Sequence, residues 1–439
     1  MNDRRRRGLE PMRVVLDNHA VAIAKEAHAT PAVTVVASVA AGSSADPLEA
    51  PGTAHLLSRS LDRGTTRRSA EQIAEELDSR GVSLTSAVNR HSTSLWCTVL
   101  TEDLEPMLDL LADVIADPSL PDKEVEARKG EAVTAILQDE DSPAAVASER
   151  LLVLLYTDGH PYGRRLKGSV ETVRGLDRSN LASFHRDCFA PSNLTVTVVG
   201  DVEARRAVDL VDRAFGTWRR KAVAWPALPP VAAPQVRQRL VIPMMAKAQA
   251  DIACGLVTIR QTDPECHAFA VLNNILGQYG IGGRLGDSIR EKQGMAYYVF
   301  SSLEASYEPG PLVIRAGVDP ANVDRALSSI EHELETISRD GVTESELRES
   351  KRHLAGSLPR MLETNDGIAS FLQFAEEFGL GTDYDARLPS LIGEVTLEEV
   401  NRLAREFLSP DRAVAVVAGP YGEAEQRGPA AQRIAAARR

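Results

Sequence analysis

The sequence has no long hydrophobic run, no closely spaced cysteines and no excess of positive charge, and each absence excludes a class of protein. No apolar run reaches the ~20 residues that a membrane-spanning helix needs. The formal net charge of −12 argues against nucleic acid or an anionic membrane as the main partner. The cysteines form no Cys-x-x-Cys pair, which favours reduced, mostly buried thiols at Cys97, Cys188, Cys254 and Cys266.

The N-terminal stretch also lacks a targeting signal. Arginines occupy positions 4–7 and resemble the basic start of a secretory signal, but no uninterrupted apolar segment follows. Residues 14–41 are broken by Asp17, Asn18, His19, Lys25, Glu26 and His28. We therefore expect a flexible tail over residues 1–11 and a cytoplasmic location.

The chain is long enough for more than one domain, and it repeats itself weakly. With 439 residues, of which 43% are hydrophobic, it exceeds one ordinary core. Residues 189–200 and 408–419 each run from a helix through a proline turn into an apolar strand closed by glycine. The two copies keep the same register. A period this long indicates duplicated domains rather than a solenoid of short repeats.

A proline-rich segment separates the two copies. Residues 225–234 contain four prolines and no charge, which is typical of an extended linker. We predict a first domain over residues 12–220, a linker over 221–234, a second domain over 235–420 and a C-terminal tail over 421–439.

Hydrophobic periodicity predicts a mixture of strands and helices in the first domain. Ser69 and Gln72 form a capping box at the start of one helix, and Trp96 and Cys97 are expected on opposite faces of a strand. The predicted strands are residues 12–16, 20–25, 33–41, 82–100 and 194–199. The predicted helices begin near residues 53 and 69 or cover 105–114, 123–138, 143–156 and 178–187.

Residues 51–61 read Pro-Gly-Thr-Ala-His-Leu-Leu-Ser-Arg-Ser-Leu, which resembles the zinc helix of the pitrilysin/insulinase metallopeptidases. Their inverted motif, His-x-x-Glu-His, supplies two imidazole ligands on one helical face and a glutamate general base. His55 matches the first histidine, but Ser58 stands at the base position and Arg59 at the second ligand position. A serine cannot take a proton from zinc-bound water at neutral pH, and a guanidinium is a permanent cation that repels a metal.

The third ligand of that family is missing as well. It is a glutamate in a Glu-Ile pair ahead of an Asp-x-Pro turn, and Ala135 stands there in this chain. The resemblance therefore implies no metal and no cofactor in this chain. We interpret His55 as a packed or capped histidine. Arg59 is either a surface cation or a replacement that fills the vacated metal space with its charge paired to a carboxylate, and both interpretations stay open.

The resemblance extends through the N-terminal half of the chain. The turn His-Pro-Tyr-Gly at residues 160–163, Gly168, and a Pro-x-Asn turn at residues 191–193 all have counterparts in the family's first domain. The strand that follows ends in Gly200-Asp201, as it does there. The match is therefore not limited to one short motif.

The second half carries the strongest positive motif. A glycine-rich segment precedes Ile-Arg-Glu-Lys-Gln-Gly-Met-Ala-Tyr at residues 289–297, and together they resemble the family's glycine-rich turn and its Leu-Arg-Glu-Lys-x-Gly-Leu-Ala-Tyr segment. In that family the arginine and tyrosine reach the substrate backbone, and they map to Arg290 and Tyr297. We expect Arg290 on a helix and Tyr297 on or just before the following strand, with Gly294 allowing the turn between them. Guanidinium and phenol groups are donors of fixed geometry, which suits a carbonyl beside a scissile bond. The glycine-rich loop comprises Gly277, Gly280, Gly282 and Gly283.

The resemblance implies an α/β (α+β) fold of two related domains, each a mostly antiparallel sheet packed with helices, arranged as a clamshell. Some peptidases of this family are built from two different subunits. This chain resembles the one that has lost the zinc motif, as in the alpha-like subunit of the mitochondrial processing peptidase. The implied partners are a homologous zinc-bearing subunit and a peptide or unfolded polypeptide, and the same surfaces are compatible with a homodimer. Zinc is then expected in the partner subunit.

Two other functions are open at this stage. A structural scaffold subunit of a larger complex, without peptidase activity, would not need the Arg290–Tyr297 pair. A hydrolase with another metal set needs three or more ligands in suitable spacing, which the scattered His160, His185 and His267 do not provide. We therefore expect a chain that is inactive alone and active as a subunit.

Overall fold

The computed structural model describes residues 8–157, 159–221, 228–278 and 282–422, which fall into two compact units. The N-terminal unit consists of Met1–Leu137, Arg165–Ala227 and Leu358–Arg387. The C-terminal unit consists of Gln138–Arg164, Leu228–Ser357 and Leu388–Arg439. Each unit is thus assembled from three separate segments of the chain.

The N-terminal unit is built on a six-stranded sheet rich in valine and alanine, whose β-branched members favour extended backbone. Its strands are β1 (Met12–Val15), β2 (Val21–Glu26), β3 (Ala32–Val39), β4 (Thr85–Val88), β5 (Thr93–Leu100) and β6 (Leu194–Gly200). They lie in the order β1-β2-β6-β3-β5-β4. The pair β2 and β6 is parallel and the other pairs are antiparallel. In β5, Cys97 and Trp96 pack into different cores, so they lie on opposite faces as predicted.

Helices pack on this sheet, and several begin at side-chain caps. The capping box of Ser69 and Gln72 is present at the start of α2, as the sequence predicts. Asp177 caps α7 in the same way with Asn180. The helices of this region are α1 (Thr53–Ser58), α2 (Ala70–Asp78), α3 (Leu104–Ala116), α4 (Asp122–Glu140), α6 (Val170–Gly175), α7 (Arg178–Cys188), α8 (Ala204–Phe215) and α12 (Asn365–Glu377).

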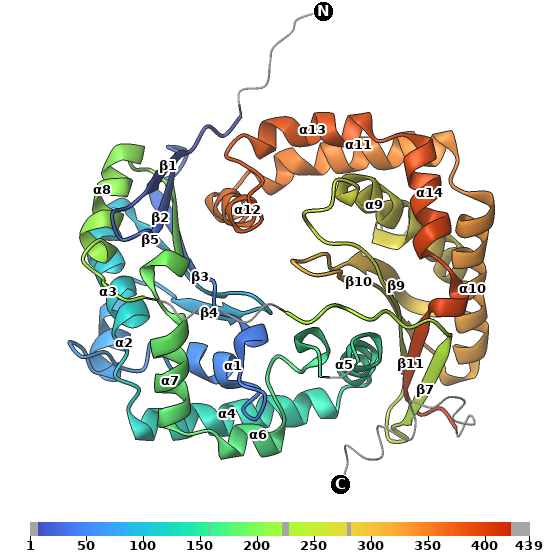
Figure 1. Ribbon diagram of the computed structural model, residues 1–439, viewed down its shortest axis with the longest axis horizontal. Coiled ribbons are helices and arrows are strands. Elements are labelled where there is room, and N and C mark those ends of the chain that lie inside the picture. The colour runs from blue at the N-terminus through green and yellow to red at the C-terminus, as the bar shows by residue number, and fades with distance from the viewer. Residues whose placement is uncertain (1–7, 158, 222–227, 279–281, 423–439) are drawn as a thin grey trace, which may run out of the picture. The chain divides into compact units, whose positions relative to one another are not determined.

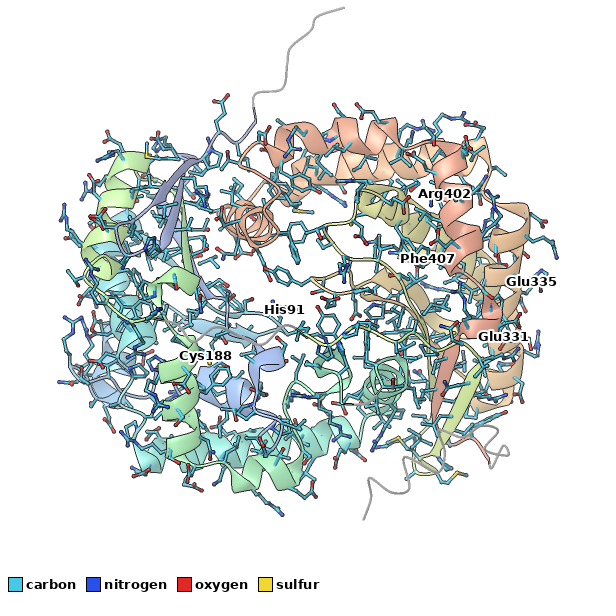
Figure 2. All side chains as sticks on the ribbon, in the orientation of Figure 1. His91, Cys188, Glu331, Glu335, Arg402 and Phe407 are labelled. Atoms are coloured by element: carbon cyan, nitrogen blue, oxygen red, sulfur yellow. The ribbon has the colours of Figure 1, made fainter. Side chains whose placement is uncertain are left out.

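The C-terminal unit is built on a five-stranded sheet in the order β7-β11-β8-β10-β9. Its strands are β7 (Gln238–Pro243), β8 (Ala250–Val257), β9 (Ala296–Leu303), β10 (Pro311–Val318) and β11 (Val414–Gly419). Its helices are α5 (Pro143–Leu155), α9 (Cys266–Asn273), α10 (Val323–Asp340), α11 (Glu344–Met361), α13 (Tyr384–Glu394) and α14 (Leu397–Phe407), with π-helices η5 (Asn274–Gln278) and η7 (Gly286–Lys292). Phe407 of α14, which is labelled in Figure 2, meets Phe269 of α9 edge-on, and the ring centroids of the two lie 5.4 Å apart.

The two sheets repeat one topology, as the weak sequence repeat predicts. In the first copy a short turn at Pro191–Asn193 leads into β6, which lies between parallel β2 and antiparallel β3. In the second copy the turn Pro410–Arg412 leads into β11, which lies between parallel β7 and antiparallel β8. Both strands end in a glycine of positive φ, +152° at Gly200 and +143° at Gly419. The fold class of two related α/β units is therefore confirmed, and β4 and β9 occupy equivalent edge positions.

Each unit contains one helix from the opposite half of the chain. α12 packs on β3 and β6 through Ile368, Ala369 and Leu372, and Gln373 accepts a hydrogen bond from Thr197 at 2.9 Å. Figure 1 shows this orange helix beside the blue and green strands of the N-terminal sheet.

The green α5 lies instead beside β8 and β11 of the C-terminal sheet (Figure 1). Its close approach explains one glycine, because a Cβ at Gly255 would lie 3.0 Å from Leu151 and from Leu155. Helices α12 and α5 therefore occupy equivalent places on the two sheets, because β3 and β6 of the first sheet correspond to β8 and β11 of the second.

The predicted domain ranges contain the two sheets but not all of their helices. Strands β1–β6 lie within residues 12–220 and strands β7–β11 within 235–420. Whether each range folds as a domain stays a prediction. Parts of the predicted tails and linker, namely residues 1–7, 222–227 and 423–439, lie outside the described residues. Among the helices that are described, none combines the length and the apolar character needed to cross a bilayer.

Candidate functional site

A buried carboxylate fixes the start of α1, the helix that carries His55. Asp46 accepts the backbone N–H groups of Gly52 (2.7 Å) and Ala54 (2.8 Å). Gly52 has φ of +97°, and a Cβ there would lie 2.6 Å from the carbonyl oxygen of Lys167. Because both the φ value and the space require glycine, the Gly-x-Ala-His segment is specified by packing as well as by chemistry.

Ser58 and Arg59, at the base and second-ligand positions, have ordinary structural contacts. Ser58 is buried, and its hydroxyl donates to the carbonyl oxygen of His55 at 2.9 Å. That hydrogen bond serves the backbone of the helix itself. Arg59 follows α1, and its half-exposed guanidinium pairs with the carboxylate of Glu131 on α4 at 3.7 Å. Arg59 is thus both partly solvated and paired, which combines parts of the two interpretations left open by the sequence.

This ion pair connects the end of α1 to α4, the helix that carries Ala135. Glu131 and Ala135 are four residues apart on α4 and so share a helical face. Glu131 also pairs with Arg128 at 2.8 Å. Glu131 is a residue that sequence reasoning missed, because nothing in a single sequence shows which acidic residue of a long helix faces α1.

A second charged pair lies just after α1. Arg63 approaches the carboxylate of Asp62 at 3.2 Å. Burial raises the pKa of Asp62, and the nearby guanidinium groups of Arg63, Arg128 and Arg59 oppose that rise. Arginine side chains and carboxylates therefore neighbour one another around the end of α1.

The residues at the zinc-motif positions do not fit a zinc ion. Zinc sites use three or four histidine, cysteine or carboxylate ligands, and this set offers one imidazole, a hydroxyl, a guanidinium and a methyl group. Within the described ranges, no group of three or more His, Cys, Asp and Glu side chains is placed to hold a metal ion. The zinc content of the chain itself stays a prediction.

The C-terminal unit carries the second candidate region, where η7 turns into β9. Arg290 lies on η7, and its side chain is 46% exposed, with Glu291 as a loose partner at 3.8 Å. The turn is made by Gly294, which has φ of +61° and donates its N–H to the carbonyl oxygen of Arg290 at 3.0 Å. The next N–H, of Met295, donates to Ile289 at 3.1 Å. These caps reverse the chain directly from the helix into the strand, as the sequence predicts.

Tyr297 lies on β9 at a β-bulge. Tyr298 pairs with Gly317 of β10, whereas Ala296 pairs with Val318, so Tyr297 is an extra residue without a partner on β10. A bulge re-aims side chains next to it. Tyr297 is 83% exposed, a high value for an aromatic residue on a strand. The sequence placed Arg290 on a helix and Tyr297 on the next strand, but it did not reveal the bulge.

Two glycines of the glycine-rich loop have a packing role. A Cβ at Gly277 would lie 2.9 Å from the backbone nitrogen of Ser301 on β9, and one at Gly283 would lie 2.8 Å from the Cα of Gly277. The two ends of the loop therefore touch through their backbones and against β9. Gly282 is exposed, and Gly280 lies outside the described residues. A peptide-binding role of the loop stays a prediction.

The exit of this loop is anchored by an ion pair. Arg284 makes a two-pronged contact with Glu346 of α11, at 2.6 and 2.9 Å, and donates to the carbonyl oxygen of Gly341 at 3.0 Å. Both partners are largely shielded from water, and the pKa of Glu346 is lowered by these hydrogen bonds despite its burial. The start of η7 is thus held firmly on the unit.

Comparison with known proteins decides the family. Residues 21–167 match the family described as Insulinase (Peptidase family M16), and residues 175–354 match the Peptidase M16 inactive domain. The chain belongs to the M16 (insulinase) peptidase family. Together the two matches cover most of the chain, so the resemblance seen in the motifs is confirmed over both halves.

Several relatives span nearly the same length. An uncharacterized zinc protease of Mycobacterium tuberculosis is 31% identical over 94% of each chain. An uncharacterized zinc protease of Bacillus subtilis is 28% identical and covers 86% of this chain and 91% of its own length. The mitochondrial-processing peptidase subunit beta of Caenorhabditis elegans is 23% identical, over 84% of this chain and 81% of its own.

A solved structure supports the fold. The peptidase M16 inactive domain from Pseudomonas fluorescens superposes with a TM-score of 0.87, at 24% identity, over 95% of this chain and 99% of that one. At this identity the likeness shows the fold alone. The M16 fold is therefore secure, and the activity of this chain is argued from its own residues.

Proposed function

We propose that this chain is a zinc-free subunit of a heterodimeric M16-type peptidase. It binds peptide substrate and contributes Arg290 and Tyr297 to an active site whose zinc is held by a homologous partner subunit. The observation that carries this proposal is the contrast between the two candidate regions. The zinc positions are filled by a buried hydroxyl, a paired guanidinium and a methyl group, whereas Tyr297 is 83% exposed at a bulge.

The exposed pair suits the chemistry of peptide hydrolysis. Attack on a peptide carbonyl places negative charge on its oxygen, and donors aimed at that oxygen stabilise the transition state. A phenol and a guanidinium are such donors, and neither needs a metal ligand beside it. Tyrosine combines an apolar ring with a polar hydroxyl, a combination that is enriched at binding surfaces. Retention of both groups favours a role in substrate binding over that of a pure scaffold.

An unpaired strand edge supports peptide binding by the N-terminal unit. Among the described strands, β4 has a neighbour on one side only, and it packs near α1. An extended peptide can add to such an edge through its backbone groups. A peptide bound there would lie beside the altered zinc positions.

Two further features fit a subunit of an intracellular peptidase. All four cysteines are free and buried, and burial raises the pKa of the Cys97 and Cys254 thiols to about 12. Such thiols suit a reducing compartment, so we place the protein in the cytoplasm. The relatives include proteins named zinc proteases and one named a subunit of a processing peptidase, and these names are compatible with a zinc-bearing partner subunit.

The test is reconstitution with a zinc-bearing M16 homologue from the same organism. The isolated chain should cleave no peptide, and the mixture should give a complex of two different chains with activity that neither has alone. Tyr297→Phe should assemble normally and lower turnover about a hundredfold, the usual cost of ~3 kcal/mol for one lost transition-state donor.

Tyr421→Phe is the matched control for this test. It removes the same hydroxyl from the same unit, where it contacts Arg239 and Asp324 at 3.0 and 2.6 Å. It should leave turnover unchanged. A chain that stays a monomer or homodimer and gains no activity on mixing contradicts the proposal. Unchanged turnover for Tyr297→Phe in an assembled complex would indicate that the chain serves only as a structural scaffold.

A further inference from the structure

Two consecutive tyrosines meet the bulge of β9, and the structure treats them differently. Tyr297 is 83% exposed, whereas Tyr298 is half-buried and pairs with Gly317. Successive side chains of a strand point to opposite faces, so a shift of one residue exchanges their places. Because both residues are tyrosine, the chemistry of the side chains does not decide which of the two is exposed to solvent. Something else must fix the register.

Tyr298 is held by a buried carboxylate two strands away. Its hydroxyl donates to Oδ1 of Asp251 on β8 at 2.5 Å, and the side chain of Gln249 donates to the same oxygen at 3.1 Å. Asp251 is 5% exposed. Strands lie about 4.8 Å apart, so the phenol must cross the intervening strand β10 to reach it. A charge-assisted hydrogen bond to a buried acceptor is among the stronger polar contacts in a protein.

Gly317 makes that crossing feasible. It is the residue of β10 that lies between Tyr298 and Asp251, since it pairs with both. A Cβ at position 317 would lie 2.5 Å from Cε1 of the Tyr298 ring and 2.3 Å from the side-chain nitrogen of Gln249. Any other residue would push the phenol away from the carboxylate. The glycine is required by close approach and not by its backbone angles.

We propose that Tyr298, Asp251 and Gly317 are positioning residues that set the register of the bulge and so display Tyr297 to the substrate. We call the hydrogen bond from Tyr298 to Asp251 across Gly317 the positioning lock. Its role in catalysis rests on the proposed function of Tyr297, but the lock itself is a property of this chain alone. Slippage by one residue would bring Tyr297 to the carboxylate and turn Tyr298 outward. The hydrogen bond across Gly317 opposes that slip. Once the register changes, Tyr298 no longer lies opposite Gly317, so its hydroxyl loses the path to Asp251.

The lock is tested on the isolated chain by nitration with tetranitromethane, which reacts with exposed phenolate. Burial, followed by the hydrogen bond and the charge of Asp251, raises the pKa of Tyr298 well above its usual range. Each unit of that rise lowers the phenolate fraction about tenfold. Peptide mapping of the wild-type chain should therefore find nitration at Tyr297 at least ~10-fold faster than at Tyr298.

Two variants remove the lock in different ways. The double variant Tyr298→Phe/Asp251→Leu removes donor and acceptor together, which avoids leaving a buried charge unpaired. It should slow nitration of Tyr297 several-fold if the register is released. Gly317→Ala keeps both tyrosines and should bring the nitration ratio toward one. Asp251→Asn, which keeps an acceptor oxygen, should retain the wild-type preference for Tyr297. An unchanged Tyr297 nitration rate in the double variant, together with an unchanged ratio in Gly317→Ala, would overturn the proposal if circular dichroism shows both chains folded.

Turnover of the assembled complex gives the second test. Tyr298→Phe should lower kcat about tenfold to a hundredfold with KM little changed, because a displaced donor acts on the transition state. In a Tyr297→Phe background the same change should cost nothing further, since the hydroxyl that it positions is already gone. A full additional loss in that background would mean that Tyr298 only stabilises the fold. If Tyr297→Phe is silent while the nitration ratios shift, the proposed function fails and the positioning lock stands.

Discussion

The region around α1 and the region around β9 differ in what remains of an active site. At α1 the scaffold persists, because Asp46 still caps the helix and Gly52 still lies against Lys167, but the chemical groups are replaced. At β9, Arg290 and Tyr297 match the arginine and tyrosine of the family motif in sequence, and both side chains are exposed. Tyr297 and Arg290 have exposed fractions of 83% and 46%.

This difference shows that packing and catalysis are separable in the family fold. A helix cap, a required glycine and a buried hydroxyl keep α1 in place without any metal. The exposed Tyr297 at its bulge has no comparable packing role, which is compatible with the substrate-binding role proposed above. The following experiments test that contrast, beginning with the largest expected effect.

Restoring two ligands should convert the first region into a zinc site. In the variant Arg59→His/Ala135→Glu, the new imidazole lies one turn from His55 on α1, and the new carboxylate lies one turn from Glu131, which already approaches residue 59. Even outer-shell partners are worth about 10–100-fold in zinc affinity, so two new ligands should add at least ~10²-fold. Metal analysis and zinc titration by calorimetry would measure this gain.

The wild-type chain and a His55→Ala version of that variant are the controls. Wild type should carry no stoichiometric zinc, and loss of His55 should remove most of the gained affinity. A variant that binds no better than wild type would show that α1 and α4 do not present these positions to a common point. Tight zinc in the wild-type chain, abolished by His55→Ala, would overturn our interpretation of the lost motif.

Acid should weaken the N-terminal unit through buried neutral histidine. Desolvation lowers the pKa of His185 to about 4, and its Nε2 contacts the carbonyl oxygen of Ile115 at 2.8 Å while Arg220 donates to Nδ1. The folded pKa lies below the unfolded value of about 6.5, so the stability is complete above that pH and is lost as the pH falls toward 4. Complete loss amounts to roughly 3 kcal/mol, and about 2 kcal/mol should go between pH 7 and 5.

Urea unfolding of wild type and His185→Asn at pH 7 and pH 5 checks this. The variant starts less stable at pH 7, but its stability should depend less on pH by about the same 2 kcal/mol. His91, labelled in Figure 2, also has a pKa lowered to about 4 by burial and by Arg90, so some dependence will remain. Equal pH dependence in the two proteins would show that folding does not lower the pKa of His185.

The conservative change Arg290→Lys should cost the assembled complex about tenfold in turnover. Lysine keeps the charge but loses the planar donor fork of the guanidinium, so it aims fewer hydrogen bonds at the carbonyl. Arg59→Lys is the matched control in the other region, and it should leave turnover unchanged because that charge only pairs with Glu131. Comparable losses for both variants would erase the distinction between the two regions.

Many of the helix caps and turns could be predicted from the sequence because each depends on residues that are close together in the chain. The capping box at Ser69, the glycine turn at Gly294 and the paired proline turns before β6 and β11 each specify structure over a few residues. The substitutions at the zinc-motif positions could also be predicted, because the sequence alone shows Arg59 at the position of the second ligand.

The features that escaped prediction depend on contacts between distant segments. The exchange of α5 and α12 between halves follows from which sheet each apolar face meets, and a helical period does not state that. The bulge at Tyr297 follows from pairing with β10, and the reach of Tyr298 to Asp251 follows from a glycine on a third strand. Only a folded chain brings these three segments together.

The smallest expected effect is on stability at the altered zinc position. Arg59→Ala removes a half-exposed ion pair with an N–O distance of 3.7 Å, which is worth less than ~1 kcal/mol and is weaker in high salt. Arg284→Ala removes a two-pronged and largely buried pair with Glu346, so it should cost more than Arg59→Ala at every salt concentration. Urea midpoints at 50 and 500 mM NaCl compare the two. If Arg59→Ala proved as costly as Arg284→Ala, the guanidinium at the second-ligand position would be a structural replacement for the metal, holding α1 to α4 as zinc would. A small cost leaves it as a cation that merely excludes zinc.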